Sequence, residues 1–199
     1  MKRSIVVLLI CLAMGIPLIA AAAAYQLDAD HSSIQFKIRH LTVSNVTGTF
    51  NRVKGSASIE GEDPSTLKAE VTIEAASIDT GHEKRDEHLR TPDFLDVAKY
   101  PVITFVSKRI VKGEPGKLKL IGDLTLHGVT REITVDLEGP TPEIKDPWGN
   151  FRRGTTGTAK IDRRDFGITW NKALDTGGLV VGNDVGIYVE VEWVRKPQP

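Results

Sequence analysis

Sulfur-containing residues are scarce in this chain of 199 residues, which has one cysteine and two methionines. Cys11 and both methionines fall within the first 24 residues. The chain from Tyr25 onward therefore has no disulfide framework, no thiol nucleophile and no thiolate metal site.

An excess of basic charge is also lacking, because 26 Lys and Arg residues are balanced by 26 Asp and Glu residues. Two of the basic residues, Lys2 and Arg3, lie at the extreme N-terminus, so the remainder is slightly acidic. Proteins that bind nucleic acid generally need a broad basic surface to neutralise phosphates. The composition therefore argues against nucleic acid as a partner.

A long hydrophobic run occurs only at the N-terminus. Two basic residues precede an apolar stretch from Ile5 to Ile19, and an alanine block, Ala20 to Ala24, follows it. A charged start, an apolar centre and a small-residue end are typical of a secretory signal peptide. The stretch is short for a bilayer span and contains a proline, which makes a retained membrane anchor the weaker alternative. We expect a cleaved signal peptide over residues 1–24 and a single exported domain over residues 25–199.

Alternation of apolar and polar residues dominates the sequence after residue 32. It is clearest from Ser33 to His40, where Ile34, Phe36 and Ile38 alternate with polar side chains. This period of two is typical of a strand with one buried face. Further strands are predicted at 46–60, 67–74, 102–111, 117–127, 132–137, 153–162 and 185–193. Because no run is continuously apolar, the strands are predicted to be antiparallel, and His127-Gly128 indicates a tight hairpin between two of them.

One stretch breaks this alternation. Thr80 to Glu83 fits a capping box, and Asp86 and Arg90 have the spacing of an ion pair between successive helical turns. Between Gly81 and Asp93, Leu89 is the only large apolar side chain. We therefore expect a short helical connector around residues 81–98, lying outside the core or across an opening.

Eight antiparallel strands, each with one apolar face, can close on themselves and so leave no exposed edge. The predicted fold is all-β, an eight-stranded antiparallel β-barrel. Such a barrel either is filled by its own side chains or encloses one ligand, and the pattern leaves both interpretations open. The residues predicted to face its interior are Ile34, Phe36, Ile38, Phe50, Val71, Ile73, Phe94, Ile103, Phe105, Leu124, Leu126 and Phe166.

Short motifs follow one another in a fixed order along nearly the whole chain from Tyr25. They are Tyr25-Gln-Leu-Asp28, His31-Ser32, Phe36 to Leu41, Gly48-Thr-Phe50, Ser77 to Thr80, His82 to Arg90, Asp93-Phe-Leu95, Lys99-Tyr-Pro101, Gly122 to Thr130, Asp146-Pro-Trp-Gly149 and Arg164 to Ile168. In this order they resemble the YceI-like family of periplasmic polyisoprenoid-binding proteins. The motifs between Ser77 and Pro101 are its most specific part.

The resemblance implies an extended, lipocalin-like barrel in the periplasm, with a long apolar tunnel that holds an isoprenoid or fatty-acyl chain. It implies a carrier and not an enzyme, with the bound lipid as ligand and no cofactor. It also favours a lined tunnel over a filled core. The glycine-rich connection from Asn171 to Gly182 varies in length in the family, so the closure of the tunnel at that end stays open.

Motifs for metal binding and catalysis are missing from the sequence. His82 and His88 are six residues apart, which differs from the spacing of two ligands on a zinc-binding helix. His31 and His40 would face opposite sides of a regular strand. No G-x-S-x-G motif occurs, and the glycine-rich segment lacks the lysine of a phosphate-binding loop. We expect no metal site and no catalytic residue.

Polar side chains gather around the predicted helix. His82, Arg85, His88 and Arg90 either form a collar over the barrel mouth that contacts a ligand head group, or belong to a connector held by salt bridges. His40 ends the inward-facing series of its strand, where it is either a polar group at the same mouth or a hydrogen-bonded histidine. An arginine at the mouth could bind a phosphate or donate to a quinone carbonyl.

The sequence thus predicts a carrier for an amphiphile with a long apolar tail, such as a polyisoprenoid, an isoprenoid quinone or a fatty-acyl ligand. Two alternatives stay open: a ligand-free structural or stress-related interaction module, and a lipid-directed enzyme. The expected partners are the lipid itself and, transiently, the inner membrane or a membrane protein. The expected oligomeric state is a monomer or a homodimer.

Overall fold

The computed structural model describes residues 22–113, 117–174 and 177–197. This part of the chain forms twelve strands, one α-helix and four short 3-10 turns. The strands are β1 (Ala23–Leu27), β2 (Ser33–His40), β3 (Ser44–Phe50), β4 (Val53–Ile59), β5 (Lys68–Glu74), β6 (Ile78–Asp79), β7 (Val102–Lys112), β8 (Lys117–Leu126), β9 (Val129–Glu138), β10 (Ile144–Lys145), β11 (Phe151–Asp162) and β12 (Val181–Arg195). The helix is α1 (Glu83–Arg90), and the turns are η1 (Ala29–His31), η2 (Pro64–Thr66), η3 (Ala75–Ser77) and η4 (Arg163–Phe166).

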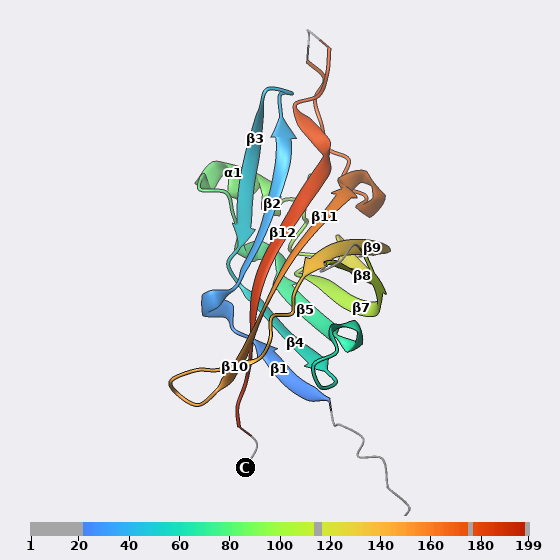
Figure 1. The fold of residues 1–199 in the computed structure, drawn as a ribbon. Helices are drawn as coiled ribbons and strands as arrows, with labels where there is room; N and C mark the ends of the chain where they lie inside the picture. The colour runs from blue at the N-terminus through green and yellow to red at the C-terminus, as the bar shows by residue number, and fades with distance from the viewer. Residues whose placement is uncertain (1–21, 114–116, 175–176, 198–199) are drawn as a thin grey trace, which may run out of the picture.

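The strands form a closed antiparallel barrel (Figure 1). Eight of them follow one another around the ring in the order β12, β1, β4, β5, β7, β8, β9 and β11, and the pairing of β11 with β12 closes it. Closure gives the ring strands a neighbour on both sides, which removes the exposed edges of an open sheet. The predicted eight-stranded antiparallel barrel is confirmed.

The membership of the ring differs from the sequence prediction at one place. The run at 46–60 is two strands, because the chain leaves the ladder at Asn51 and Arg52, whose backbone N–H groups donate to the backbone oxygen and the Oγ of Ser77 (both 3.1 Å). Only the second of these strands, β4, belongs to the ring. The predicted strand at 33–40, β2, lies outside the ring, and its place is taken by β1, which is too short for its alternation to be recognised and pairs with β4 and β12.

The barrel wall is extended on one side by β2 and β3. The long strand β12 pairs with β1 near Trp193 and with β2 from Glu190 to Val181, so β1 and β2 follow each other along the same edge. Strand β3 then pairs with β2 and with β6. We call the end that carries the turn after His40 the upper end, and the end near β1 and β10 the lower end, as they lie in Figure 1.

The hairpin between β8 and β9 forms where it was predicted. His127 and Gly128 both have positive φ angles, 52° and 73°, as a two-residue hairpin turn requires. A Cβ atom at Gly128 would collide with the ring of Tyr100, so this turn is closed to larger residues.

The helical connector also forms, but its start and its ion pair differ from the prediction. Helix α1 begins at Glu83 after an N-cap at His82, whose Nδ1 accepts the N–H of Arg85 (3.3 Å). The predicted pair of Asp86 with Arg90 is wrong. Asp86 accepts the N–H and hydroxyl of Thr80 (3.0 and 2.5 Å), and Arg90 donates to two backbone carbonyls before the helix (2.9 and 2.7 Å). Both side chains are used to attach α1 to the preceding segment.

Most of the predicted signal peptide lies outside the described residues. Ala23 and Ala24, its last two residues, pair with Ile59 and Ser58 as part of β1. The cleavage site stays a prediction. No helix within residues 22–113, 117–174 and 177–197 combines the length and the apolar composition that crossing a bilayer requires.

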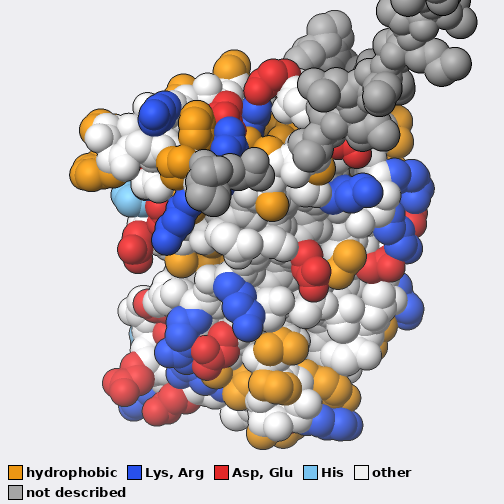
Figure 2. All heavy atoms as spheres, turned by 90° about the horizontal axis from the view of Figure 1, so that it is seen from below, with side chains coloured by type: hydrophobic (Ala, Val, Ile, Leu, Met, Phe, Trp, Pro, Cys, Tyr) orange, Lys and Arg blue, Asp and Glu red, His pale blue; other side chains and the backbone are white. Residues whose placement is uncertain are grey.

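Charged side chains of both signs are interspersed over the face seen from below the barrel (Figure 2). The Lys and Arg side chains gathered along the right edge of this view have Asp and Glu side chains beside them. The mixture of both signs agrees with the balanced composition.

Candidate functional site: the barrel cavity

The barrel encloses a cavity of about 410 Å³, within the size range of sites for small ligands. Its wall consists almost entirely of apolar side chains, which come mainly from β2, β3, β5, β7, β8, β9, β11 and β12 and from the segment of α1. The interior is therefore lined and not filled. All the predicted interior residues except Phe166 lie at this wall, and a ligand role for them stays a prediction.

Phe166 is a correction to the predicted cavity lining. It lies in η4, has only 1% of its surface exposed, and packs into the apolar core around the upper half of the barrel. Its backbone oxygen accepts a hydrogen bond from Nδ1 of His127 (3.1 Å), which ties η4 to the β8–β9 hairpin. Alternation could not place this residue, because a 3-10 turn follows the strand and changes the direction of the side chain.

The lower end of the cavity is closed by bulky and polar side chains. Trp193 and Thr155 line the cavity there, and the indole Nε1 of Trp193 donates to Oγ1 of Thr155 (3.1 Å). Next to Thr155 on β11 lies Arg153, 5% exposed, which donates to the hydroxyl of Tyr25 (3.0 Å) and pairs with Glu62. An apolar ligand entering from the upper end would therefore meet a closed floor.

The upper end of the cavity contains polar side chains. Of the residues predicted at the mouth, His40, Arg85 and His88 line the cavity. The other two do not: His82 caps α1, and Arg90 is held by the carbonyls before the helix, so both border a separate polar hollow on the outside. The predicted collar is thus divided between the cavity and the outer surface of α1.

Aromatic contacts fix α1 over this end. The ring of His88 contacts the rings of Phe94 and Trp170 edge-on at centroid distances of 5.0 and 5.1 Å, and its Nε2 lies 2.8 Å from Oδ2 of Asp93. Leu89, the one large apolar side chain of the helix, faces the cavity. The helix therefore borders the cavity, which agrees with the second of the two places that its composition left open, outside the core or across an opening.

Two cationic residues at the cavity were missed by the sequence interpretation. Arg39 is exposed at the rim and donates from Nε and Nη2 to the backbone oxygen of Thr42 (3.0 and 2.6 Å). Arg163 is 3% exposed and donates to the backbone oxygens of Gly182 and Ile168 (2.8 and 2.7 Å). Burial lowers the pKa of Arg163. Strand alternation places Arg39 outside, and Arg163 lies just past the end of β11, so the sequence has no signal that directs either toward the lumen.

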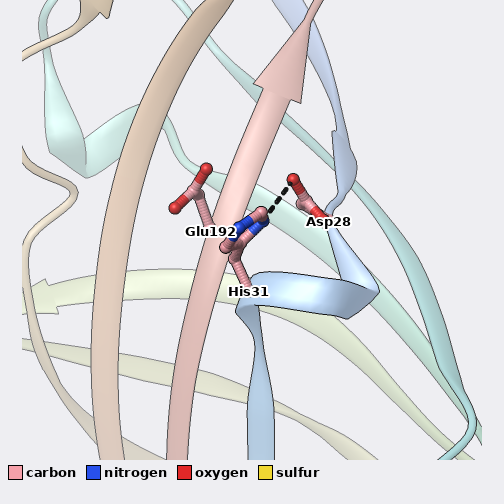
Figure 3. A group of neighbouring side chains, drawn as sticks. All are labelled: Asp28, His31 and Glu192. Carbon is pink, nitrogen blue, oxygen red and sulfur yellow. Dashed lines mark hydrogen bonds and ion pairs between the residues drawn. The ribbon is translucent and has the colours of Figure 1, made fainter. Parts of the chain in front are cut away.

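A second group of titratable side chains, Asp28, His31 and Glu192, lies outside the cavity at the start of β2 (Figure 3). Their ligand atoms lie within 4.8 Å of one another, and the hydrogen bond from His31 to Asp28 (3.0 Å) raises the pKa of His31. Arg152 already pairs with Asp28 (2.8 Å) and Glu192, and with Asp146 (2.7 Å). Because its guanidinium supplies the positive charge, this group is explained as an ion-pair network that joins β11, β12 and η1.

Acid is expected to weaken the fold through Asp146. Burial opposes the ionisation of this carboxyl, but hydrogen bonds from Arg152 (2.7 Å), from the Asn150 side chain (3.1 Å), and from the backbone N–H groups of Asn150 and Trp148 (2.8 and 2.9 Å) outweigh it and lower its pKa to about 2. A carboxyl with a lowered pKa stabilises the folded state above its ordinary value of 3.8 and loses that contribution as the pH falls toward about 2.

The measurement is Tm by circular dichroism between about pH 6 and pH 2, for the wild type and Asp146→Asn. The wild type should be more stable at neutral pH, and the two should converge near the acid end. Curves that stay parallel over the whole range would contradict this role of Asp146.

The sequence matches the YceI-like domain family over residues 25–193. A UPF0312 protein of Vibrio parahaemolyticus is 41% identical over 170 residues, which cover 84% of this chain and 89% of the relative. The structure is similar to the crystal structure of the Campylobacter jejuni YceI protein, with a TM-score of 0.64 and 34% identity over 81% of this chain and 91% of that one. It also resembles a polyisoprenoid binding domain from Saccharophagus degradans, with a TM-score of 0.60, 17% identity, and coverage of 87% and 98%.

The family match covers most of the chain, and the Vibrio relative agrees with it over a comparable length. The chain therefore belongs to the YceI-like family.

Proposed function

We propose that this chain is a periplasmic carrier that holds the apolar tail of a long-chain amphiphile, such as a polyisoprenoid, an isoprenoid quinone or a fatty-acyl lipid, inside its barrel. The observation that carries the proposal is the cavity itself, whose wall is nearly all hydrocarbon and whose floor is closed by Trp193 and Thr155. The predicted signal peptide supports a periplasmic location. The likeness to a polyisoprenoid binding domain supports the class of ligand.

The energetics favour a tail-binding protein. Each buried methylene contributes about 0.8 kcal/mol, so a chain of several isoprene units can offset the entropy lost on binding with few polar contacts. Water in such an apolar cavity finds few hydrogen-bonding partners, so a hydrocarbon chain replaces it at little cost.

A carrier is also favoured over an enzyme by the composition of the wall. Among the described residues that line the cavity there is no serine, cysteine, aspartate or glutamate. Nucleophilic and general acid–base catalysis both rely on such groups held next to a base or a second acid. His88 has a carboxylate partner, Asp93 (2.8 Å), but the described lining offers neither histidine a serine or cysteine to activate.

Affinity is expected to increase with tail length. Farnesol and geranylgeraniol differ by one isoprene unit, and the longer alcohol should bind at least about tenfold more tightly, because the extra unit buries several more carbons. Isothermal titration with delipidated protein measures both constants, and native mass spectrometry of the protein as purified identifies any lipid already bound. Equal affinity for the two alcohols, or no binding of either, would contradict the carrier function.

A further inference from the structure

We infer that the upper end of the barrel docks on a lipid bilayer through two apolar tips, residues 41–43 in the turn between β2 and β3 and residues 178–180 in the loop that precedes β12 (Figure 1). The inference rests on the proposed carrier function and names the partner from which the lipid is taken. It starts from two exposed side chains, Val43 (74% exposed) and Leu179 (39% exposed). Single exposed apolar residues are common on protein surfaces, so the argument depends on how these two are placed.

The two tips belong to one surface. The backbone N–H of Leu41 donates to the backbone oxygen of Val180 (2.8 Å). Leu41 lies two positions before Val43, and Val180 directly follows Leu179, so this hydrogen bond holds the two exposed side chains on neighbouring segments. A bilayer that contacts one tip therefore also meets the other.

The backbone of the first tip is strained. Leu41 and Thr42 have positive φ angles, 50° and 62°, which a two-residue hairpin turn of this type requires at both central positions. Asn-Gly is the preferred sequence for such a turn, and bulky or β-branched residues are rare in this conformation. Stability of the turn therefore does not explain the sequence Leu-Thr at this place. Contact of the tip with a partner does explain it, because strained backbone persists where function requires it.

Both tips are continuous with the wall of the cavity. His40, which precedes the first tip, and Val180, which ends the second, line the cavity. A bilayer in contact with the tips therefore lies next to the interior of the barrel. The lower end also has an exposed apolar pair, Ile144 and Trp148, but neither residue lines the cavity, and the floor at that end is closed. Position thus favours the upper end as the docking end.

The charge around the tips is complementary to an acidic membrane. No Asp or Glu occurs between Asp30 and Glu60, a stretch that contains the whole first tip. Arg39 and Lys172, exposed beside the two tips, form no ion pair with any residue that the structure describes, and Asp175 lies outside the described residues. Bilayers that contain acidic phospholipids have a negative surface potential, which attracts basic residues of this kind.

The size of the surface also favours a bilayer over a protein. A stable protein interface buries about 800 Å² on each partner and needs a broad complementary face. Two narrow tips do not offer such a face, whereas a peripheral protein binds a membrane by burying a small apolar area at the boundary between head groups and acyl chains.

The test is flotation of the purified protein with vesicles of phosphatidylethanolamine and phosphatidylglycerol, at low and at high salt. The wild type should bind, and Val43→Ser/Leu179→Ser should bind about tenfold more weakly or worse, because two apolar side chains are no longer buried. High salt should weaken the wild type in part, since it screens the basic residues. Neither residue lines the cavity, so the double variant should keep the wild-type affinity for geranylgeraniol in solution.

The matched control is Ile144→Ser/Trp148→Ser, which removes the exposed apolar pair from the opposite end of the barrel. It should bind the vesicles as the wild type does. Wild-type protein saturated with geranylgeraniol should also float with the vesicles, which separates docking from the capture of a lipid in the lumen. Circular dichroism checks that both variants fold, and the wild-type measurements require no variant.

Failure of docking and failure of the carrier function are distinguishable. If the wild type does not bind the vesicles, or if Val43→Ser/Leu179→Ser binds them equally well, docking through the tips is overturned, whatever the affinity for geranylgeraniol. Loss of binding only in Ile144→Ser/Trp148→Ser assigns docking to the lower end and overturns the inference. Loss of binding on saturation with geranylgeraniol overturns it as well, because the vesicles are then held through the empty cavity. The titration in solution tests the carrier function without vesicles.

Discussion

A tryptophan in place of Ala159 is expected to weaken the binding of a polyprenyl lipid by about 100-fold or more while the barrel stays folded. Ala159 lies on β11 opposite Ile187, and its small side chain lines the cavity. An indole projecting from this position would occupy space that the ligand tail needs. Excluding only three or four methylenes at about 0.8 kcal/mol each corresponds to a factor of this size.

The matched control is Ala98→Trp, because Ala98 is exposed in the segment after α1 and does not line the cavity. It adds the same side chain to the same protein without filling the lumen, so its affinity should equal that of the wild type. Titration with geranylgeraniol gives the two constants, and thermal unfolding confirms that both variants are folded. Unchanged binding in Ala159→Trp would place the ligand outside the barrel.

Truncation of Phe166 is expected to have the largest effect on stability. Its ring is almost fully buried in the upper core, so Phe166→Ala should lower the free energy of unfolding by about 3–5 kcal/mol. Phe36 has the same side chain but is only partly buried and faces the cavity, so Phe36→Ala should cost roughly 1–2 kcal/mol. Phe36→Ala should in addition weaken lipid binding, because it removes part of the tail's contact surface.

Urea denaturation of the ligand-free protein gives both free energies, and the slopes show whether the unfolding transition is unchanged. The comparison tests whether Phe166 belongs to the packed core and Phe36 to the wall of the cavity. An equal loss of stability in the two variants would mean that the interior is packed as one core, with no separate ligand space.

Several features of the candidate site could be predicted from local sequence alone. In a strand, successive side chains point to opposite faces, so the alternation around Ile34, Phe36 and Ile38 is enough to assign them to one face. The helix over the opening could be recognised from its lack of alternation and its single large apolar residue, Leu89. The aromatic ring of Phe166 was placed wrongly because it follows the end of a strand, where this rule no longer applies.

The charged residues could not be predicted in the same way. Whether an arginine is paired depends on which carboxylates other strands bring to it, and these partners lie far away in the sequence. Arg152 finds Asp28 and Glu192 through the pairing of β11 with β12 and of β12 with β1, whereas Arg163 finds only carbonyl groups. Arg152 lies on β11 and Arg163 lies directly after its end, so the local sequence does not tell the two apart. They differ only in the groups that the folded barrel brings next to them.

The sequence by itself determined that the chain from Tyr25 is built of antiparallel strands with one apolar face each, has no cysteine chemistry and contains a short polar connector helix. Those properties follow from periodicity and composition, which act over a few neighbouring residues. The tertiary structure alone decided that β1 and not β2 completes the ring, that the interior is lined and not filled, and that three arginines reach its wall. These depend on ring closure between β11 and β12 and on the volume left inside, which no local stretch of sequence specifies.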